Sequence, residues 1–88
     1  MRGSLDKEFK LTIKRLIIKT CRIDVAPESV PDDVPLLGPG STLGLDSLDT
    51  LELAVALKNQ FGLQINDSKE AMRIIKSVNS LADAIQPG

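Results

Sequence analysis

The 88-residue sequence has no histidine, no tryptophan, no tyrosine, two phenylalanines and one cysteine. Without histidine there is no imidazole base and no imidazole metal ligand, which excludes Ser–His nucleophilic catalysis. A single cysteine cannot form an internal disulfide or a multi-cysteine zinc site. These absences favour a binding or carrier protein over an enzyme, and we predict no catalytic residues and no resident metal.

Long apolar runs are also missing. No stretch reaches the ~18 apolar residues that a membrane-spanning helix requires. No secretory leader is recognisable, so we expect a cytoplasmic protein without a membrane span. The length allows one small domain, which we place at residues 5–86. Residues 1–4 are interpreted as a cloning remnant or flexible N-terminus and residues 87–88 as a C-terminal tail, and we expect a monomer.

The net charge of −1 hides a strong asymmetry along the chain. Residues 1–23 carry seven basic and two acidic side chains, whereas residues 24–57 carry seven acidic and no basic ones. The basic segment lacks the interleaved aromatics of a nucleic-acid surface, so we predict a helix with a solvated basic face and no nucleic-acid partner. The acidic middle segment would attract a basic partner.

Apolar periodicity predicts three main helices and one short helix. The expected ranges are about Leu5–Cys21 with Ser4 as N-cap, about 46–61, about 67–75 and about 77–85. Asp46 or Ser47 would cap the second helix, and Gly62 would end it. We therefore predict an all-α fold, a small four-helix bundle with a long loop between the first two helices.

That loop runs from about Arg22 to Asp46, where the helical pattern disappears. Prolines and glycines break helices and permit turns there: Pro27, Pro31, Pro35, Gly38, Pro39, Gly40 and Gly44. Several apolar residues are expected to pin the loop to the core: Val25, Val30, Val34, Leu36, Leu37, Leu43 and Leu45. We therefore expect an ordered loop rather than a disordered one.

The second helix has more apolar residues than one buried face requires. Leu53, Leu57 and Phe61 form one stripe, which we expect to face the core. A second stripe consists of Leu48, Leu51 and Val55 and is interleaved with Asp49 and Glu52. Either the thin core covers this second stripe as well, or the stripe faces solvent and docks a partner.

Any chemistry of this chain is expected at Ser47, a hydroxyl at a helix start between Asp46 and Asp49. A free hydroxyl without a base is a poor nucleophile, so Ser47 would be modified by another enzyme or would serve only as a cap. A helix N-terminus suits a phosphate group. The two carboxylates would repel that phosphate unless a divalent cation such as magnesium bridged them.

The segment Gly44–Leu53, GLDSLDTLEL, closely resembles the 4′-phosphopantetheine attachment motif of acyl carrier proteins. The resemblance extends over about residues 5–86. The stretch Phe61–Ile65 is similar to the turn after the family's second helix, and Ser77–Leu81 is similar to the start of its fourth helix.

The resemblance implies a phosphoprotein with a 4′-phosphopantetheine arm on Ser47. A phosphopantetheinyl transferase would attach the arm from coenzyme A with magnesium, and Asp46 matches the position that assists this step. The arm would carry an acyl chain as a thioester for fatty-acid or polyketide-type synthesis, and the aliphatic core would shield it at ~0.8 kcal/mol per buried CH₂. Acyl-loading enzymes, ketosynthases and other synthase enzymes would bring basic patches to the partner-docking positions, which are Leu48, Asp49, Leu51, Glu52 and Val55.

Several features depart from typical fatty-acid carriers. The second helix ends in Lys58-Asn59-Gln60 instead of several glutamates, the first helix is unusually basic, the third is about two residues longer, and the loop over residues 35–41 differs. We hypothesise a specialised carrier that serves a dedicated synthase. Two alternatives stay open: an amino-acid carrier of the peptidyl or D-alanyl type, and an unmodified helical interaction module. Met72 and Ile74-Ile75 would line an acyl tunnel or simply pack in the core.

Overall fold

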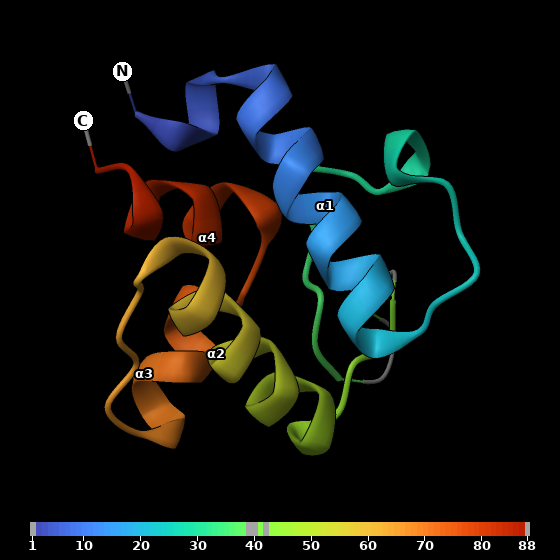
Figure 1. The fold of residues 1–88 in the computed structure, drawn as a ribbon. Coiled ribbons are helices and arrows are strands. Elements are labelled where there is room, and N and C mark those ends of the chain that lie inside the picture. Colours follow the sequence, from blue (N-terminus) through green and yellow to red (C-terminus); the bar gives the residue numbers. More distant parts are fainter. Residues whose placement is uncertain (1, 39–40, 42, 88) are drawn as a thin grey trace.

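A computed structural model describes residues 2–38, 41 and 43–87. Within these ranges the chain forms four α-helices: α1 Lys7–Cys21, α2 Ser47–Phe61, α3 Ser68–Ile74 and α4 Val78–Ile85 (Figure 1). Two short 3₁₀ helices, Gly3–Leu5 and Pro27–Ser29, precede α1 and interrupt the long loop. The predicted all-α four-helix fold is confirmed. Met1, Pro39, Gly40 and Gly88, which the sequence analysis assigned to the termini and the loop, lie outside the described residues.

The helices enclose one aliphatic core. Helix α1 packs against both α2 and α4, and the short α3 contacts α2 and α4 (Figure 1). Side chains with no solvent exposure come from α1, α2, α4, the turn after α3 and the long loop: Ile13, Ile17, Leu36, Leu53, Leu57, Ile75, Val78, Leu81 and Ala82. Each such side chain contributes ~1.5–3 kcal/mol of hydrophobic stabilisation relative to an exposed one. None of the helices in the described ranges is long and apolar enough to cross a membrane.

Local capping sets the helix ends. Asp46, Asp67 and Ser77 each accept a hydrogen bond from the backbone N–H three residues later, as N-cap residues do. Gly62 ends α2 with φ +70°, a left-handed conformation that glycine adopts without strain. The predicted starts of the last three helices are therefore confirmed.

The start of the first helix was predicted wrongly. Asp6, not Ser4, is the N-cap, and its side chain accepts a hydrogen bond from the backbone N–H of Phe9. The backbone N–H of Ser4 instead donates to Asp83 at 2.9 Å, and Gly3 donates to the carbonyl of Gln86 at 2.8 Å. These contacts with the end of α4 hold Gly3–Leu5 in a separate 3₁₀ turn, so α1 begins only after Asp6.

The long loop is ordered over its described residues and reaches the core, as predicted. Val30, Leu36 and Leu45 are at most 2% exposed, whereas Val25 is 38% exposed and does not anchor the loop. A parallel bridge joins Leu37 to Leu45, and the backbone N–H of Leu36 donates to the carbonyl of Lys76. The loop is thereby tied to the turn between α3 and α4.

The basic face of α1 is not fully solvated, contrary to expectation. The ammonium groups of Lys10 and Lys14 lie 2.9 and 2.7 Å from the carboxylate oxygens of Asp32, and both lysine side chains are nearly buried. Partial burial raises the pKa of Asp32, but the two lysines together hold it below its usual value. The carbonyl of Asp32 also accepts a hydrogen bond from the backbone N–H of Asn79. This acidic residue therefore joins the loop to α1 and α4.

Candidate functional site

Ser47 is the first residue of α2 and is exposed. Asp46 and Asp49 form a reciprocal capping box beside it. The Asp46 carboxylate accepts from the Asp49 N–H at 2.9 Å, and the Asp49 carboxylate accepts from the Asp46 N–H at 3.1 Å. Among the hydrogen bonds of the described residues, none involves the Ser47 hydroxyl. Asp46 is therefore the cap, and the hydroxyl of Ser47 is free for another reaction.

The same Asp–Ser dipeptide begins α3. Asp67 caps that helix by accepting from the Glu70 N–H at 2.8 Å, and Ser68 is exposed at its first position. Of these two helices, α2 also has the reciprocal bond, in which the side chain of the third residue accepts from the backbone N–H of the cap. The chain thus contains two similarly placed serine hydroxyls, and the dipeptide alone does not distinguish them.

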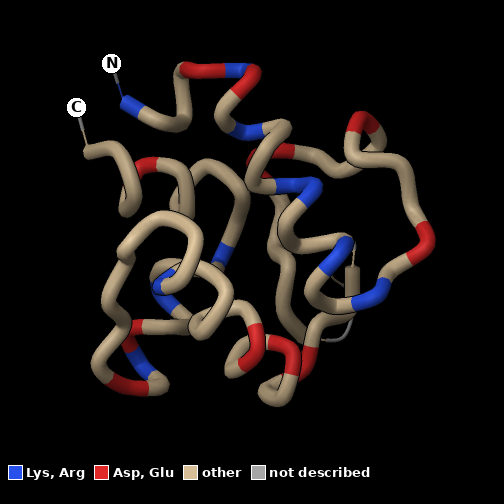
Figure 2. The backbone as a smooth tube through the Cα atoms, viewed as in Figure 1, with Lys and Arg blue, Asp and Glu red and all other residues tan. Residues whose placement is uncertain are grey.

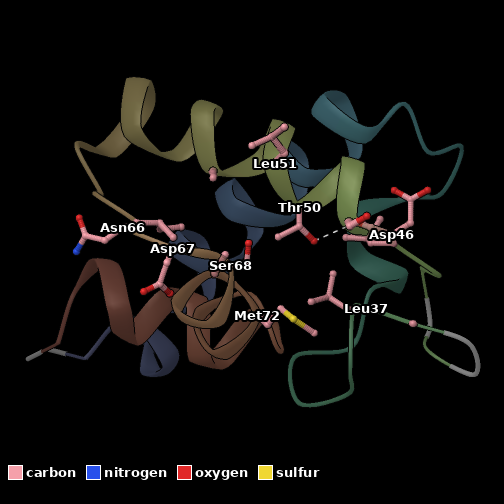
Figure 3. Close-up of a pocket in the computed structure, with 14 residues that line it drawn as sticks. Leu37, Asp46, Thr50, Leu51, Asn66, Asp67, Ser68 and Met72 are labelled. Atoms are coloured by element: carbon pink, nitrogen blue, oxygen red, sulfur yellow. Dashed lines mark hydrogen bonds between the residues drawn. The ribbon is translucent and has the colours of Figure 1, made fainter.

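Both serines line one cavity of about 430 Å³ between α2, α3 and the long loop. Figure 3 shows this cavity, with Ser68 labelled. Figure 3 shows Thr50 and Leu51 on one side of the cavity and Met72 and Leu37 on the other. The remaining lining residues are Gly38, Leu45, Asp46, Ala54, Ile65, Asn66, Asp67 and Ala71. The wall is mostly aliphatic with polar groups at its edges, as in sites for small apolar ligands.

Only part of this wall is predictable from the sequence. Met72 lines the cavity, which was one of its two interpretations, whereas Ile74 and Ile75 are core residues. Thr50 was missed. Its side chain is 9% exposed, and its hydroxyl donates to the carbonyl of Asp46 at 3.0 Å. A threonine can donate its hydroxyl to the carbonyl of the residue four positions earlier in a helix. The spacing of Asp46 and Thr50 in the sequence could therefore have indicated this bond.

The two apolar stripes of α2 have different environments. Leu53 and Leu57 are fully buried and Phe61 is half-buried, so the predicted core stripe is confirmed. The second stripe faces solvent: Leu48, Leu51 and Val55 are 62%, 63% and 57% exposed. Met72 on α3 is 61% exposed. An apolar surface therefore lies beside both the cavity and Ser47.

Acidic residues gather where the loop enters α2 (Figure 2). Asp46 is exposed, and Asp49 and Glu52 are half-buried. Burial, followed in size by the charges of Asp49, Glu52 and Asp46, raises the pKa of the Cys21 thiol to about 11. Cys21 ends α1 and is half-buried against the core. The carboxylates at the start of α2 therefore create a negative potential that reaches the end of α1.

The acidic residues of this region do not by themselves form a metal centre. Over residues 2–38, 41 and 43–87, no three histidine, cysteine, aspartate or glutamate side chains come together in a way that could hold an ion. A carboxylate such as Asp46 contributes one or two oxygen ligands, whereas magnesium also takes ligands from a phosphate or from water.

Comparison with known proteins identifies the family. Residues 11–85 match the family model described as the phosphopantetheine attachment site. The chain is 34% identical to an acyl carrier protein of Buchnera aphidicola over 80 residues, which cover 91% of each chain. It is 36% identical over 72 residues to acyl carrier protein 4, chloroplastic, of Cuphea lanceolata, and 43% identical over 54 residues to an acyl carrier protein of Campylobacter hominis. The chain belongs to the acyl carrier protein family.

The chain spans about half the length of the chloroplastic relatives that it matches. The match covers 80% of the chain and 50% of the Cuphea protein, and 61% of the chain and 63% of the Campylobacter protein. The match to the family model begins at residue 11, within α1, and ends at residue 85, the last residue of α4, so it includes part of α1 and all of the other three helices. The resemblance predicted from the segment Gly44–Leu53 is therefore confirmed at the level of the family.

Proposed function

We propose that this protein carries acyl intermediates as thioesters on a 4′-phosphopantetheine arm attached to Ser47. The observation that carries the proposal is the position of Ser47. It is exposed at the first position of α2, its hydroxyl has no hydrogen bond to the described residues, and it lies within the residues that match the attachment-site family. When attached, the arm supplies a terminal thiol for the acyl group. The chain itself supplies the hydroxyl, its orientation and the surface around it.

The attachment reaction requires a phosphopantetheinyl transferase and coenzyme A. The Ser47 oxygen forms a new bond to the phosphorus next to pantetheine, and the pyrophosphate bond of coenzyme A breaks. Adenosine 3′,5′-bisphosphate leaves with the bonding electrons, and the proton of the hydroxyl passes to a base of the transferase. This chain has no histidine to accept that proton. Because Asp46 caps α2, the serine oxygen is not used as the cap and has no competing partner among the described residues.

Asp46 would assist attachment by binding magnesium together with the transferase and coenzyme A. One of its oxygens is fixed by the Asp49 N–H at 2.9 Å, which holds the carboxylate beside Ser47. A shared magnesium ion would also offset the repulsion between the incoming phosphate and the carboxylates of Asp46 and Asp49.

The cavity beside Ser47 would hold the first part of the acyl cargo. Its volume is about 430 Å³, and Leu37, Leu51, Ile65 and Met72 provide an aliphatic wall. Each CH₂ group transferred from water into such a wall is stabilised by ~0.8 kcal/mol. Shielding of this kind keeps an exposed chain from driving aggregation while the carrier moves between enzymes.

The exposed stripe of α2 would dock the synthesis enzymes. Leu48, Leu51 and Val55 supply apolar contact area, and Asp49 and Glu52 would attract basic residues of acyl-loading enzymes and ketosynthases. Exposed charge pairs are weak and screened by salt, which suits a carrier that leaves each enzyme quickly.

We keep the hypothesis of a specialised carrier within the family. The exposed Lys58-Asn59-Gln60 at the end of α2 and the Lys10 and Lys14 pairs with Asp32 support it. A ketosynthase of bacterial fatty-acid synthesis is expected to elongate this carrier more slowly than its own. Equal rates would contradict the hypothesis. The cytoplasmic location stays a prediction, because the relatives named above include chloroplastic proteins.

The attachment site is tested by co-expression with a broad-specificity phosphopantetheinyl transferase and intact-mass measurement. The wild-type chain is expected to gain the mass of one phosphopantetheine group. Ser47→Ala should gain none, and Ser68→Ala, which removes the matching hydroxyl of α3, should gain the same mass as wild type. A gain that persists in Ser47→Ala, or no gain in the wild type, would contradict the proposal.

A further inference from the structure

The exposed stripe of α2 has a different charge on each of its two sides. An α-helix turns ~100° per residue, so Glu52 and Lys58 lie ~60° to opposite sides of Val55. The Glu52 side also carries Asp49, and the charges of both residues raise the pKa of the Cys21 thiol at the end of α1. The Lys58 side faces the cavity, because Ser47 and Ala54 lie on the same side of α2 as Lys58 and both line the cavity.

Both charged groups are accessible to a partner. Lys58 is exposed and Glu52 is half-buried. Over the part of the chain that the structure describes, neither side chain takes part in an ion pair. The apolar residues between them are more than half exposed, at 63% for Leu51 and 57% for Val55. The stripe is thus flanked by an acid on one side and a base on the other.

From this arrangement we propose that the natural elongating enzyme of this carrier has a docking face with charges of both signs. A basic residue of the enzyme contacts Glu52 and Asp49, an apolar ridge covers Leu51 and Val55, and an acidic residue contacts Lys58. The inference rests on the proposed carrier function. Charge complementarity on both sides fixes the direction in which the carrier approaches, because a reversed orientation would place like charges together.

A docking face that carries only Arg and Lys would be repelled by Lys58. Two charges of the same sign that face each other across an interface lower the association rate and the affinity. Removal of one of the two charges raises the association rate and the affinity again. The enzyme probe for the test is therefore a ketosynthase whose carrier-docking face is entirely basic.

Each holo variant is first loaded with the same acyl group as a thioester on its arm, and the experiment compares these acyl-loaded variants as substrates of that ketosynthase. Lys58→Glu is expected to raise kcat/KM about three- to ten-fold over wild type, the effect of ~1 kcal/mol at one contact, and Lys58→Gln should give an intermediate value. Lys7→Glu is the matched control. It changes the net charge by the same amount on an exposed residue at the start of α1, and it should leave kcat/KM near the wild-type value.

A second arm reverses the charges. In the ketosynthase, the basic residue that meets the end of α2 is replaced by glutamate, and wild type should then become a better substrate than Lys58→Glu. Equal kcat/KM values for Lys58→Glu and Lys7→Glu in the first arm, or no exchange of order in the second, would overturn the proposal. Intact-mass measurement first confirms one arm per molecule in every variant. Failure to attach the arm would contradict the carrier function, whereas full attachment with unchanged kinetics would contradict only the docking inference.

Discussion

The rings of Phe9 and Phe61 meet edge to face, with their centroids 5.7 Å apart and their planes at 75°. They are the only aromatic residues of the sequence, and they join the first part of α1 to the last turn of α2. Edge-to-face pairs add ~0.5–1.5 kcal/mol to the stabilisation from buried area. This contact closes the end of the core opposite to Ser47.

Replacement of Phe61 by alanine should therefore lower the free energy of unfolding by ~2 kcal/mol, less than for a fully buried ring because Phe61 is only half-buried. Urea denaturation followed by circular dichroism measures the change. Leu48→Ala, on the exposed stripe of the same helix, is the control and should stay within ~0.5 kcal/mol of wild type. Equal stability of the two variants would show that the ring pair adds nothing to the fold.

Asp32 should give the fold a dependence on acid. The nearby lysines lower its pKa in the folded state, so its ion pairs stabilise the protein above the ordinary pKa of about 4 and are lost as the pH falls below that value. Because the side chain is 36% exposed, we expect Asp32→Asn to cost only about 1 kcal/mol at pH 7. Urea titrations at pH 7 and pH 3 should show this difference shrinking in acid. A difference that is constant with pH would contradict the assignment.

The Cys21 thiol should react slowly in the folded protein. Its pKa of about 11 leaves far less thiolate at pH 8 than an ordinary cysteine has, and the thiolate is the reactive form. We expect iodoacetamide to label Cys21 roughly 100-fold more slowly in native than in urea-unfolded apo protein. In holo protein, the rapidly labelled thiol should belong to the arm. Fast labelling of native apo protein would contradict the pKa shift.

Gly3 should not tolerate a side chain. A Cβ at this position would overlap the carbonyl oxygen of Ala82, and this backbone oxygen belongs to α4 and cannot move freely. Gly3→Ala is expected to detach the turn at Gly3–Leu5 from α4 and lower the free energy of unfolding by ~1–3 kcal/mol. Leu5→Ala, at a 67% exposed residue, is the control for this segment. Thermal unfolding curves that superimpose for both variants would contradict the predicted overlap.

The sequence predicted those features that depend on neighbouring residues. Asp46, Asp67 and Ser77 cap their helices through bonds to residues three positions later, and such local signals are visible in the chain itself. Leu53 and Leu57 follow from helical spacing in the same way. The position of Ser47 at the start of α2 was predictable for these reasons.

Features that depend on distant residues were not predictable. Ser4 and Asp6 are both good caps, and the choice between them is made by Asp83 and Gln86 at the other end of the chain. The contact between Lys10 and Asp32 likewise joins residues 22 positions apart. The cavity needs α2, α3 and the loop in place, so its wall could be named only in part.

In helix α2, different side chains stabilise the core and form the outer surface. Leu53 and Leu57 are fully buried in the core, whereas Leu48, Leu51 and Val55 are more than half exposed to solvent. Substitutions on the outer stripe should therefore alter the choice of enzymes while leaving the scaffold intact. Under the proposed docking role, a carrier of this kind could acquire a new partner enzyme through a few changes on this helix without passing through unstable intermediates.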